Sequence, residues 1–417
     1  MSCFTRKDGT LYCEDVSLAD LAQQYGTPLY VYSETAFVDV YRAYDDALKG
    51  LPHHICFAMK SNSCHAVLKS LAALGCGADI VSGGELFRAT KAGIRADRIV
   101  YSGVGKTEKE MAEALQAGIL MFNVESFSEL ATLNDVAKRM GTKAKISFRI
   151  NPNVDPKTHP YIATGLKNSK FGIPWDHVME GYRRAATMAH IEVVGVDCHI
   201  GSQLTQLAPF VEAAGKLKDL VVALRADGFQ IRYVDVGGGL GITYSVEKPP
   251  AVAEYGTALC DIFSGMDVTL IAEPGRSMSG SAGVLLTQVL YTKKTDAKRF
   301  VIVDAAMNDL ARPSLYGSFH GIELVSGEPG EDELIDVVGP ICESGDFLAK
   351  DRVYPRLRAG DLIAMMSAGA YGSTMSSMYN SRPLVAEVLV SGDRAALVRS
   401  RGTCDDLMRG ESAAPWQ

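Results

Sequence analysis

The stretch that decides the fold is HICFAMKSN at residues 54–62. An unbroken apolar run from Ile55 to Met59 stops on a lysine, Lys60. A continuous apolar run of this length is typical of a parallel strand that is buried on both faces. A lysine at the end of such a strand either extends its ammonium group into solvent or is held inside a site for its nitrogen. The rest of the sequence decides between these two interpretations.

Further segments of the same kind follow Lys60, and amphipathic stretches with helical spacing separate them. They are GADIVS (77–82), RIVYSG (98–103), MFNVES (121–126), KISFRI (145–150), VVGVDCHIGS (193–202), IRYVDVGGG (231–239) and VTLIAEPGR (268–276). With ICFAMK (55–60) they make eight strand and helix units within about 220 residues, which is the size of a closed barrel. The pattern predicts an α/β fold with a (β/α)8 TIM-type barrel over residues 27–280.

The pattern changes after Arg276 to short runs that alternate apolar and polar residues. These runs are VLLTQVLYTKK (284–294), RFVIVDAAM (299–307), LIDVVGP (334–340) and AGDLIAMMSAGAY (359–371). Such runs predict antiparallel strands, and therefore a second, C-terminal β-rich domain of sandwich or barrel type over residues 281–417. The stretch TLYCEDVS (10–17) is also strand-like, and a helical pattern follows it. We expect residues 1–26 to join the second domain.

The composition narrows the classes of function. The chain has 417 residues, of which 47% are hydrophobic and 22% charged, and this suits two globular domains. Its 42 basic and 49 acidic side chains give a net charge of -7, without a basic block that could follow a phosphate backbone. A small-molecule partner is therefore expected, and no nucleic acid.

The cysteines and the N-terminus bear on the compartment. Nine cysteines are present, with no C-x-x-C pair among them, and most have apolar neighbours. This usage is typical of reduced thiols in a cytoplasmic protein. Residues 1–17 carry charges where a signal peptide would be apolar, and no apolar run reaches the roughly 18 residues of a membrane span. We expect a cytoplasmic protein with no membrane partner.

Polar side chains at the ends of the predicted strands would face one mouth of the barrel, where barrel enzymes have their active sites. These side chains are Lys60, Asp79, Glu125, Arg149, His199 and Glu273. The loops after the seventh and eighth strands read GGGLG (237–241) and EPGRS (273–277). Loops at these two places commonly bind phosphate, because glycines let backbone N–H groups approach an anion. Tight turns remain the alternative for these loops.

A phosphate site and a lysine at one barrel mouth predict pyridoxal 5'-phosphate, whose aldehyde forms a Schiff base with a lysine amine. Glu273 is the candidate partner of the pyridine nitrogen, since a carboxylate favours the protonated ring. His199 could lie flat against that ring, or it could be an ordinary core histidine. Glu125 and Arg149 are equally well ligands or partners in an ion pair. No metal site is expected.

The motifs together resemble a known family. FAMKSN, GADIVSGGEL, HIGSQ, DVGGGLGI, EPGRS, CESGD and GAYG occur in its order and spacing between about residues 27 and 390. They resemble the fold-type III pyridoxal-phosphate-dependent decarboxylases, which have an alanine-racemase-like barrel, and in particular the members that act on diaminopimelate. The resemblance implies an N-terminal barrel that carries the cofactor, a C-terminal β domain that receives the first residues of the chain, and a homodimer with shared active sites.

The resemblance also implies roles for single residues. Lys60 would form the Schiff base, His199 would stack on the ring, and Glu273 would contact the pyridine nitrogen. Asp79 belongs to the surroundings of the cofactor, and Tyr371 would close over cofactor and substrate. The residues implied for the phosphate are Ser202, Gly238, Gly239, Gly275 and Arg276.

For the substrate, the resemblance implies that Arg312 and Tyr316 hold the far carboxylate with help from Arg276. Cys342 would donate a proton and Glu343 would recognise the far amine, both from the partner subunit. The implied reaction is the last step of lysine biosynthesis. In it a carboxy-lyase removes the carboxylate at the D centre of meso-2,6-diaminoheptanedioate (diaminopimelate) and releases L-lysine and carbon dioxide.

Three alternatives remain at this point. A decarboxylase for ornithine, arginine or carboxynorspermidine would need carboxylates for a positive far end, whereas Arg312 suits an anion. An alanine racemase would have an arginine against the pyridine nitrogen where this chain has Glu273. A non-catalytic homologue would be expected to lack Lys60 or the phosphate glycines, and this chain has both.

Overall fold

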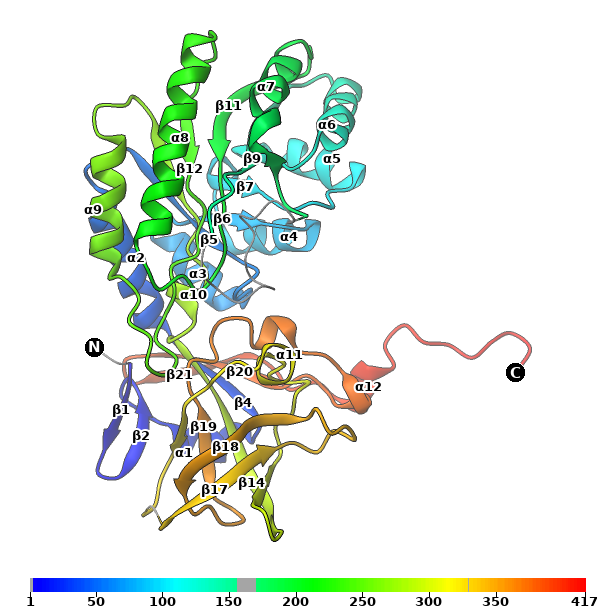
Figure 1. Cartoon of the computed structure of the whole chain (residues 1–417). Helices are drawn as coiled ribbons and strands as arrows, with labels where there is room; N and C mark the ends of the chain where they lie inside the picture. Colours follow the sequence, from blue (N-terminus) through cyan, green and yellow to red (C-terminus); the bar gives the residue numbers. More distant parts are fainter. Residues whose placement is uncertain (1–2, 156–169, 329) are drawn as a thin grey trace. The chain divides into compact units, whose positions relative to one another are not determined.

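The computed structural model describes residues 3–155, 170–328 and 330–417 (Figure 1). The chain divides into two compact units, one of Val38–Met278 and one of Met1–Phe37 together with Ser279–Gln417. No helix in the described part of the chain is long and apolar enough to cross a membrane.

A closed ring of parallel strands forms the first unit. Its members are β5 (His53–Ala58), β6 (Gly77–Ile80), β7 (Ile99–Tyr101), β8 (Met121–Val124), β9 (Ala144–Asn151), β11 (Ile191–Asp197), β12 (Tyr233–Asp235) and β13 (Thr269–Ala272). Neighbours pair in parallel around the ring, and β13 closes it by pairing with β5. Each of the eight predicted segments overlaps one of these strands, so the predicted (β/α)8 barrel is confirmed.

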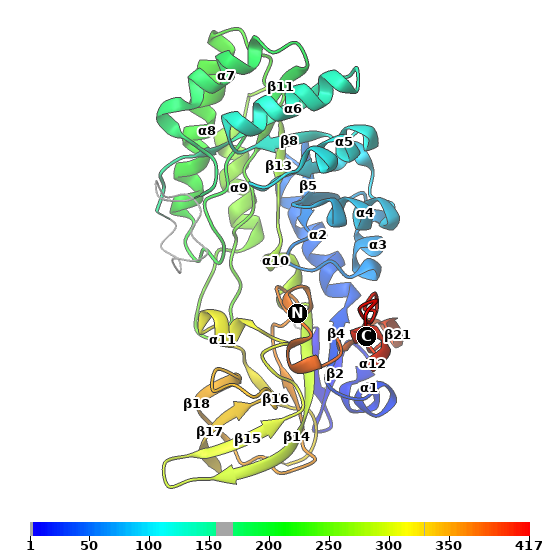
Figure 2. The same cartoon turned by 90° about the vertical axis from the view of Figure 1, so that its right-hand side faces the viewer.

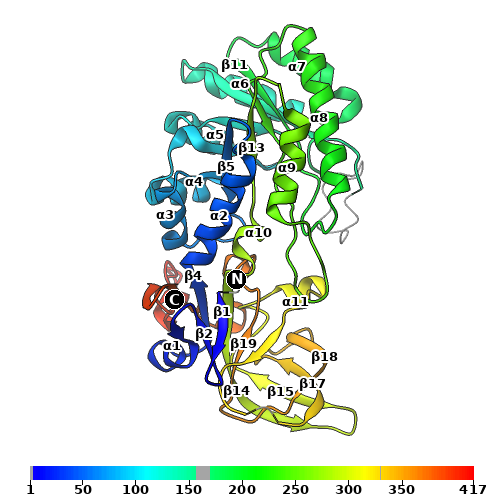
Figure 3. The ribbon, with the colours of Figure 1, turned by 90° about the vertical axis from the view of Figure 1, so that its left-hand side faces the viewer.

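Helices cover the outside of the ring. They are α2 (Glu34–Leu48), α3 (His65–Ala73), α4 (Gly83–Ala92), α5 (Glu108–Ala117), α6 (Phe127–Arg139), α7 (Val178–Ala186), α8 (Ala208–Ala226) and α9 (Val252–Phe263). Figure 2 shows α3 to α6 following one another around the barrel, and Figure 3 shows α8 beside α9. Each helix packs its apolar stripe on the strands, as a parallel sheet with apolar residues on both faces requires.

Local sequence fixes where these helices begin and end. The Ser82 hydroxyl accepts a hydrogen bond from the Glu85 N–H at the start of α4, and Gly93 ends that helix with a φ of 88°. Thr107 and Glu110 form a capping box at the start of α5. Such caps satisfy N–H groups that have no partner inside the helix. They fix the residues at which α4 and α5 begin.

The second unit is β-rich, as the sequence predicts. Its main sheet has the order β18 (Phe347–Pro355), β17 (Asp332–Val338), β15 (Arg299–Val303), β14 (Gly283–Lys294), β4 (Leu29–Ser33), β20 (Ala386–Ser391) and β21 (Arg394–Arg399). Two short strands, β16 (Ile322–Leu324) and β19 (Leu362–Met365), join through β14. Most pairs are antiparallel, but β15 pairs in parallel with β17, and β4 pairs in parallel with β20. The long connection 304–331, which contains α11 (Arg312–Tyr316), makes the parallel crossover from β15 to β17 possible.

The first residues of the chain pack on this second unit. They form β1 (Phe4–Lys7), β2 (Thr10–Cys13), β3 (Val16–Ser17) and α1 (Leu18–Tyr25). The Leu11 N–H donates a hydrogen bond of 2.7 Å to the Val325 carbonyl. Leu11 and Leu18 share a buried apolar cluster with Val284 and Val388. The unit also contains the short helix α12 (Cys404–Leu407).

Candidate active site

Lys60 lies just after β5, in the short turn that follows its last residue, Ala58. Its ammonium group donates a hydrogen bond to the carboxylate of Asp79, which lies in β6 and is fully buried. The Lys60 side chain is 33% exposed. Lys60 is therefore held at the C-terminal mouth of the barrel by a buried carboxylate, and its side chain stays partly exposed.

Glu273 follows β13 and lies among other buried carboxyl groups. Its Oε1 is 3.5 Å from Nδ2 of Asn123, which also donates to Asp235 at 3.2 Å. Burial and the charges of Asp235 and Asp79 raise the pKa of Glu273 well above its ordinary value. A cation beside Glu273 would stabilise its ionised form. The site therefore suits a ligand with a protonated ring nitrogen.

Two further buried carboxylate oxygens in the barrel also favour a bound cation. Within the described residues, Oδ1 of Asp79 and Oδ1 of Asp197 are buried without a hydrogen-bond partner. Buried polar atoms nearly always have partners in folded proteins. Such an excess of negative charge is what a bound cation or a proton would compensate.

His199 lies in the loop after β11, and the next loop fixes its ring. The Gly238 N–H donates to Nδ1 of His199 at 3.2 Å, so the neutral ring carries its hydrogen on Nε2. A Cβ on Gly237 would lie 2.7 Å from the same nitrogen. Burial and the cations of Arg149 and Lys60 lower the pKa of His199 well below its ordinary value. The imidazole is therefore neutral.

Glycines let the loops after β11, β12 and β13 meet. A Cβ on Gly238 would lie 2.1 Å from the Glu273 carbonyl oxygen, and one on Gly239, whose φ is 113°, would lie 2.6 Å from the Gly201 carbonyl oxygen. A Cβ on Gly275 would lie 3.1 Å from Cβ of Ala58. The first two distances are shorter than carbon and oxygen atoms tolerate, so a larger side chain at Gly238 or Gly239 would push the loops apart. The contact at Gly275 is tight and would need a small shift of its neighbour.

Arg276 brings a positive charge to these loops at the start of α10 (Arg276–Ser279). Its guanidinium donates to the Ser202 hydroxyl at 3.2 and 3.3 Å and to the Tyr244 hydroxyl at 2.7 Å. The structure thus brings together Ser202, Arg276 and the predicted glycines. A guanidinium, two hydroxyls and closely packed backbone form a donor set that fits a phosphate.

These groups fit pyridoxal phosphate in each of its parts: a lysine for the aldehyde, a carboxyl for the pyridine nitrogen, and donors for the phosphate. The comparisons with known proteins agree. Residues 36–280 match the family model described as pyridoxal-dependent decarboxylase, pyridoxal binding domain. The chain is 52% identical over 415 residues to the diaminopimelate decarboxylase of Pseudomonas aeruginosa, covering 100% of both chains. The chain belongs to the diaminopimelate decarboxylase family.

Solved structures of diaminopimelate decarboxylases support this assignment. The enzyme of Helicobacter pylori complexed with L-lysine has 47% identity and a TM-score of 0.91, covering 94% of this chain and 98% of that one. The enzyme of M. jannaschii in complex with L-lysine has 39% identity and a TM-score of 0.94, covering 100% of both. The resemblance predicted from the motifs is confirmed, together with the dependence on pyridoxal phosphate.

Two residues that the family motifs connect with the substrate lie in the second unit on α11. Arg312 and Tyr316 are the first and last residues of this single turn, so their side chains share one face. Arg312 is only 5% exposed. Its guanidinium contacts Nε2 of His320 at 2.9 Å and donates to the Ser318 hydroxyl at 3.3 Å.

Cys342 and Glu343 are exposed in the second unit. The Cys342 N–H donates to the Asn380 side chain at 2.9 Å, and the Tyr379 hydroxyl donates to Glu343 at 3.0 Å. Both side chains are accessible to another molecule. Tyr371 has a φ of 54° in the loop after β19. That loop is closely packed, because a Cβ on Gly372 would lie 2.4 Å from the Ala368 carbonyl oxygen.

Glu125 and Arg149, whose roles the sequence left open, form a buried ion pair of 3.1 Å. Glu125 also accepts hydrogen bonds of 2.9 Å from the Gly103 and Gly172 N–H groups. The pair therefore ties three loops of the barrel mouth together.

Three residues of the site were not predicted from the sequence. Asn123 and Asp235 are polar residues inside apolar segments, and that signal could have found them. Tyr244 lies beyond the GGGLG motif in a polar loop, and nothing in the pattern indicates its contact with Arg276.

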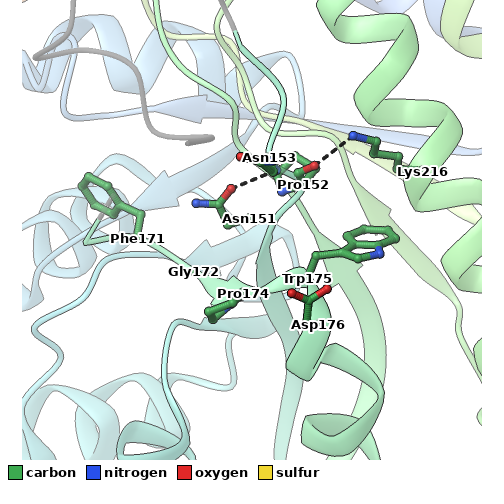
Figure 4. A pocket seen from close by; sticks show the side chains of 9 residues that line it. All are labelled: Asn151, Pro152, Asn153, Phe171, Gly172, Pro174, Trp175, Asp176 and Lys216. Atoms are coloured by element: carbon green, nitrogen blue, oxygen red, sulfur yellow. Dashed lines mark hydrogen bonds between the residues drawn. The ribbon is translucent and has the colours of Figure 1, made fainter. Parts of the chain in front are cut away.

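A separate cavity of about 440 Å³ adjoins β9, β10 (Ile173–Pro174) and the neighbouring short helix Trp175–His177 (Figure 4). In the figure, Lys216 donates to the Pro152 carbonyl at 3.0 Å, and the Asn153 N–H donates to Asn151 at 3.0 Å. None of the residues predicted for catalysis, cofactor or substrate lines this cavity.

Proposed function

We propose that this protein decarboxylates meso-diaminopimelate at its D centre to give L-lysine and carbon dioxide, in the last step of lysine biosynthesis. The observation that carries the choice of substrate is the buried guanidinium of Arg312 on the same helical face as Tyr316. Such a pair suits a carboxylate that survives the reaction. The relatives from Helicobacter pylori and M. jannaschii were solved with L-lysine, which contains that carboxylate.

Bound pyridoxal phosphate supplies an electron sink for the electron pair that the departing carboxylate leaves behind. In the barrel, Lys60 would hold the aldehyde end of the cofactor, and the carboxylate of Asp79 keeps the Lys60 amine in position. Glu273 holds a proton at the pyridine nitrogen. The neutral ring of His199 would pack on the cofactor, and Ser202, Gly238, Gly239, Gly275 and Arg276 would hold its phosphate.

The remaining roles fall to residues of the second unit. Arg312 and Tyr316 bind the retained carboxylate, with help from Arg276, and Tyr371 closes over cofactor and substrate. Cys342 donates a proton to the carbon that has lost carbon dioxide, and Glu343 binds the far ammonium group. One proton is taken up for each carbon dioxide released, so the reaction is balanced.

We further propose that the active protein is a homodimer in which Cys342 and Glu343 reach the partner's site. Their exposure on a single chain supports this. Residues 27–280 would then act as the cofactor-binding domain, and residues 1–26 with 281–417 would contribute to active site and dimer interface. We also propose a cytoplasmic location, which the free thiols of the buried Cys13, Cys56 and Cys76 support.

The test is an assay of the purified protein with pyridoxal phosphate on meso-diaminopimelate, L-ornithine and L-arginine. Of the three substrates, we expect only diaminopimelate to be decarboxylated, and its products should be lysine and carbon dioxide. Lys60→Ala is the control, and it should lose essentially all turnover because the cofactor loses its anchor. Borohydride reduction followed by mass spectrometry should place a pyridoxyl group on Lys60 of the wild type. A preference for ornithine or arginine would refute the substrate and leave the family assignment in place.

A further inference from the structure

His320 is a buried histidine in direct contact with the guanidinium of Arg312. It lies in the turn that follows α11 and is 0% exposed. Gly317, with a φ of 61°, ends the helix and turns the chain back toward Arg312. The Met366 N–H donates to the Gly321 carbonyl at 2.8 Å and so fixes the far end of this turn.

Both ring nitrogens of His320 have partners, and the partners determine its tautomer. Nδ1 lies 2.8 Å from the Met366 carbonyl oxygen, which can only accept, so Nδ1 carries the hydrogen. Nε2 lies 2.9 Å from Nη1 of Arg312, which can only donate, so Nε2 is the acceptor. The ring in this arrangement is neutral, and the Met366 carbonyl sets its orientation.

We infer that His320 is a positioning residue that aims the Arg312 guanidinium at the retained carboxylate of the substrate while leaving its positive charge in place. A planar guanidinium binds a carboxylate well only when its N–H groups point correctly. A neutral acceptor fixes one N–H group without neutralising the charge. A carboxylate in the place of the imidazole would fix the same group and also compete with the substrate for the cation.

This inference rests on the proposed role of Arg312 in substrate binding. Arg312 contacts a carboxylate of the substrate that does not react. Loss of this contact should therefore weaken the binding of the substrate and of the transition state by the same amount. Such a loss raises KM and leaves kcat largely unchanged. If His320 were needed only for folding, its replacement would lower the yield of folded holoenzyme and would not raise KM selectively over kcat.

The decisive comparison is His320→Gln against His320→Glu. The two side chains have nearly the same shape, and both can accept from Arg312. They differ in charge and in the amide NH2 group that only glutamine has. L-lysine is titrated into each holoenzyme and followed by cofactor absorbance, and KM and kcat are measured on diaminopimelate. We expect His320→Glu to bind L-lysine about tenfold or more weakly than His320→Gln, with a matching rise in KM and kcat values within about threefold of each other.

Equal or tighter binding of L-lysine by His320→Glu would overturn the inference. If that variant does not fold, His320→Leu replaces it, since it removes the acceptor altogether. Binding of L-lysine as tight as in His320→Gln would then overturn the inference. Arg312→Ala separates this outcome from a failure of the proposed function. If Arg312→Ala binds L-lysine as tightly as the wild type does, then the role of Arg312 itself is wrong.

Discussion

The side chain of Glu273 lies in a cluster of buried carboxyl groups, so its protonation depends on what binds beside it. Without a cation nearby, burial and the charges of Asp235 and Asp79 favour the neutral form and raise its pKa. A protonated pyridine nitrogen would reverse that preference, because the ion pair forms in a site from which water is largely excluded. Glu273 and the cofactor would then stabilise each other's charges.

Glu273→Gln tests this dependence. The amide keeps the shape of the side chain but cannot hold a proton at the pyridine nitrogen by charge. We expect cofactor binding to persist and kcat to fall by about 10²–10³, the usual effect of losing one strong electrostatic contact in a closed site. Cofactor content from absorbance and turnover on diaminopimelate are the two measurements. Turnover near that of the wild type would mean that the pyridine nitrogen has another partner.

Asp309 gives a residue-scale prediction for stability. Burial raises its pKa to about 6, and the side chain is 1% exposed. The unfolded chain releases this proton near pH 3.8 and the folded chain only near pH 6, so the folded state binds more protons between these values. The free energy of unfolding should therefore fall as pH rises through this window, by about 1.4 kcal/mol between pH 5 and pH 7.5 from this group.

Asp309→Asn removes this titration, so its free energy of unfolding should change with pH by about 1.4 kcal/mol less over the same interval. Urea unfolding at pH 5 and pH 7.5, followed by circular dichroism, measures the difference. Asp405, which is exposed, serves as the matched control through Asp405→Asn. A pH dependence unchanged in Asp309→Asn would show that Asp309 is ionised in the folded protein throughout.

How far single site residues can be predicted depends on where they lie. Lys60, His199 and Glu273 follow apolar strands, and a polar residue in that place is visible in the sequence. His320 and Tyr244 lie in irregular loops, and their contacts depend on how the loops fold back on Arg312 and Arg276. A local pattern of apolar and polar residues does not predict which distant side chain a loop will contact.

At the scale of elements, the barrel strands were predictable because each is an apolar run between helical patterns. Several predicted segments extend beyond the observed strands: VVGVDCHIGS reaches residue 202, whereas β11 ends at Asp197. The apolar pattern continues because the loop at the mouth is itself buried, with Cys198 and Ile200 only 2% and 3% exposed. The parallel pairing of β15 with β17 was not predictable, since an apolar run carries no sign of its direction.

Gly238→Ala tests the packing between two of these elements. The added Cβ would lie 2.1 Å from the Glu273 carbonyl oxygen, which belongs to the backbone after β13 and cannot rotate away. The loop after β12 must therefore move, and with it the N–H group that contacts His199. We expect the affinity for pyridoxal phosphate to fall about tenfold or more, equivalent to about 1.4 kcal/mol. Fluorescence titration of the cofactor-free protein with pyridoxal phosphate measures it.

Gly215→Ala is the control for that change. Gly215 lies within α8, and a Cβ there would meet nothing within 4 Å. An alanine should stabilise the helix by about 0.5–1 kcal/mol and leave cofactor affinity unchanged. If both variants bind the cofactor as the wild type does, the close approach of Gly238 to Glu273 does not matter for the phosphate site.

At the scale of the whole molecule, the question is which groups one chain can bring to its own site. Cys342 and Glu343 are exposed, and their neighbour Tyr379 is 44% exposed. A proton donor that protonates carbon in competition with water works best where water is excluded. If Cys342 has that role, it must be covered when the substrate is bound, and we propose that a second chain covers it. This is the physical reason to expect a dimer with shared sites.

Mixing two inactive variants tests the shared site directly. Lys60→Ala lacks the anchor of the cofactor, and Cys342→Ala lacks the proton donor. If Cys342 acts in the partner's site, a mixed dimer has one site with both changes and one site with neither. Random pairing makes about half of the dimers mixed, so about a quarter of all sites should recover. Subunits are unfolded together, refolded and assayed, with each variant refolded alone as the control. If mixed dimers form, as native mass spectrometry can show, and activity stays absent, then Cys342 serves the site of its own chain or has no part in catalysis.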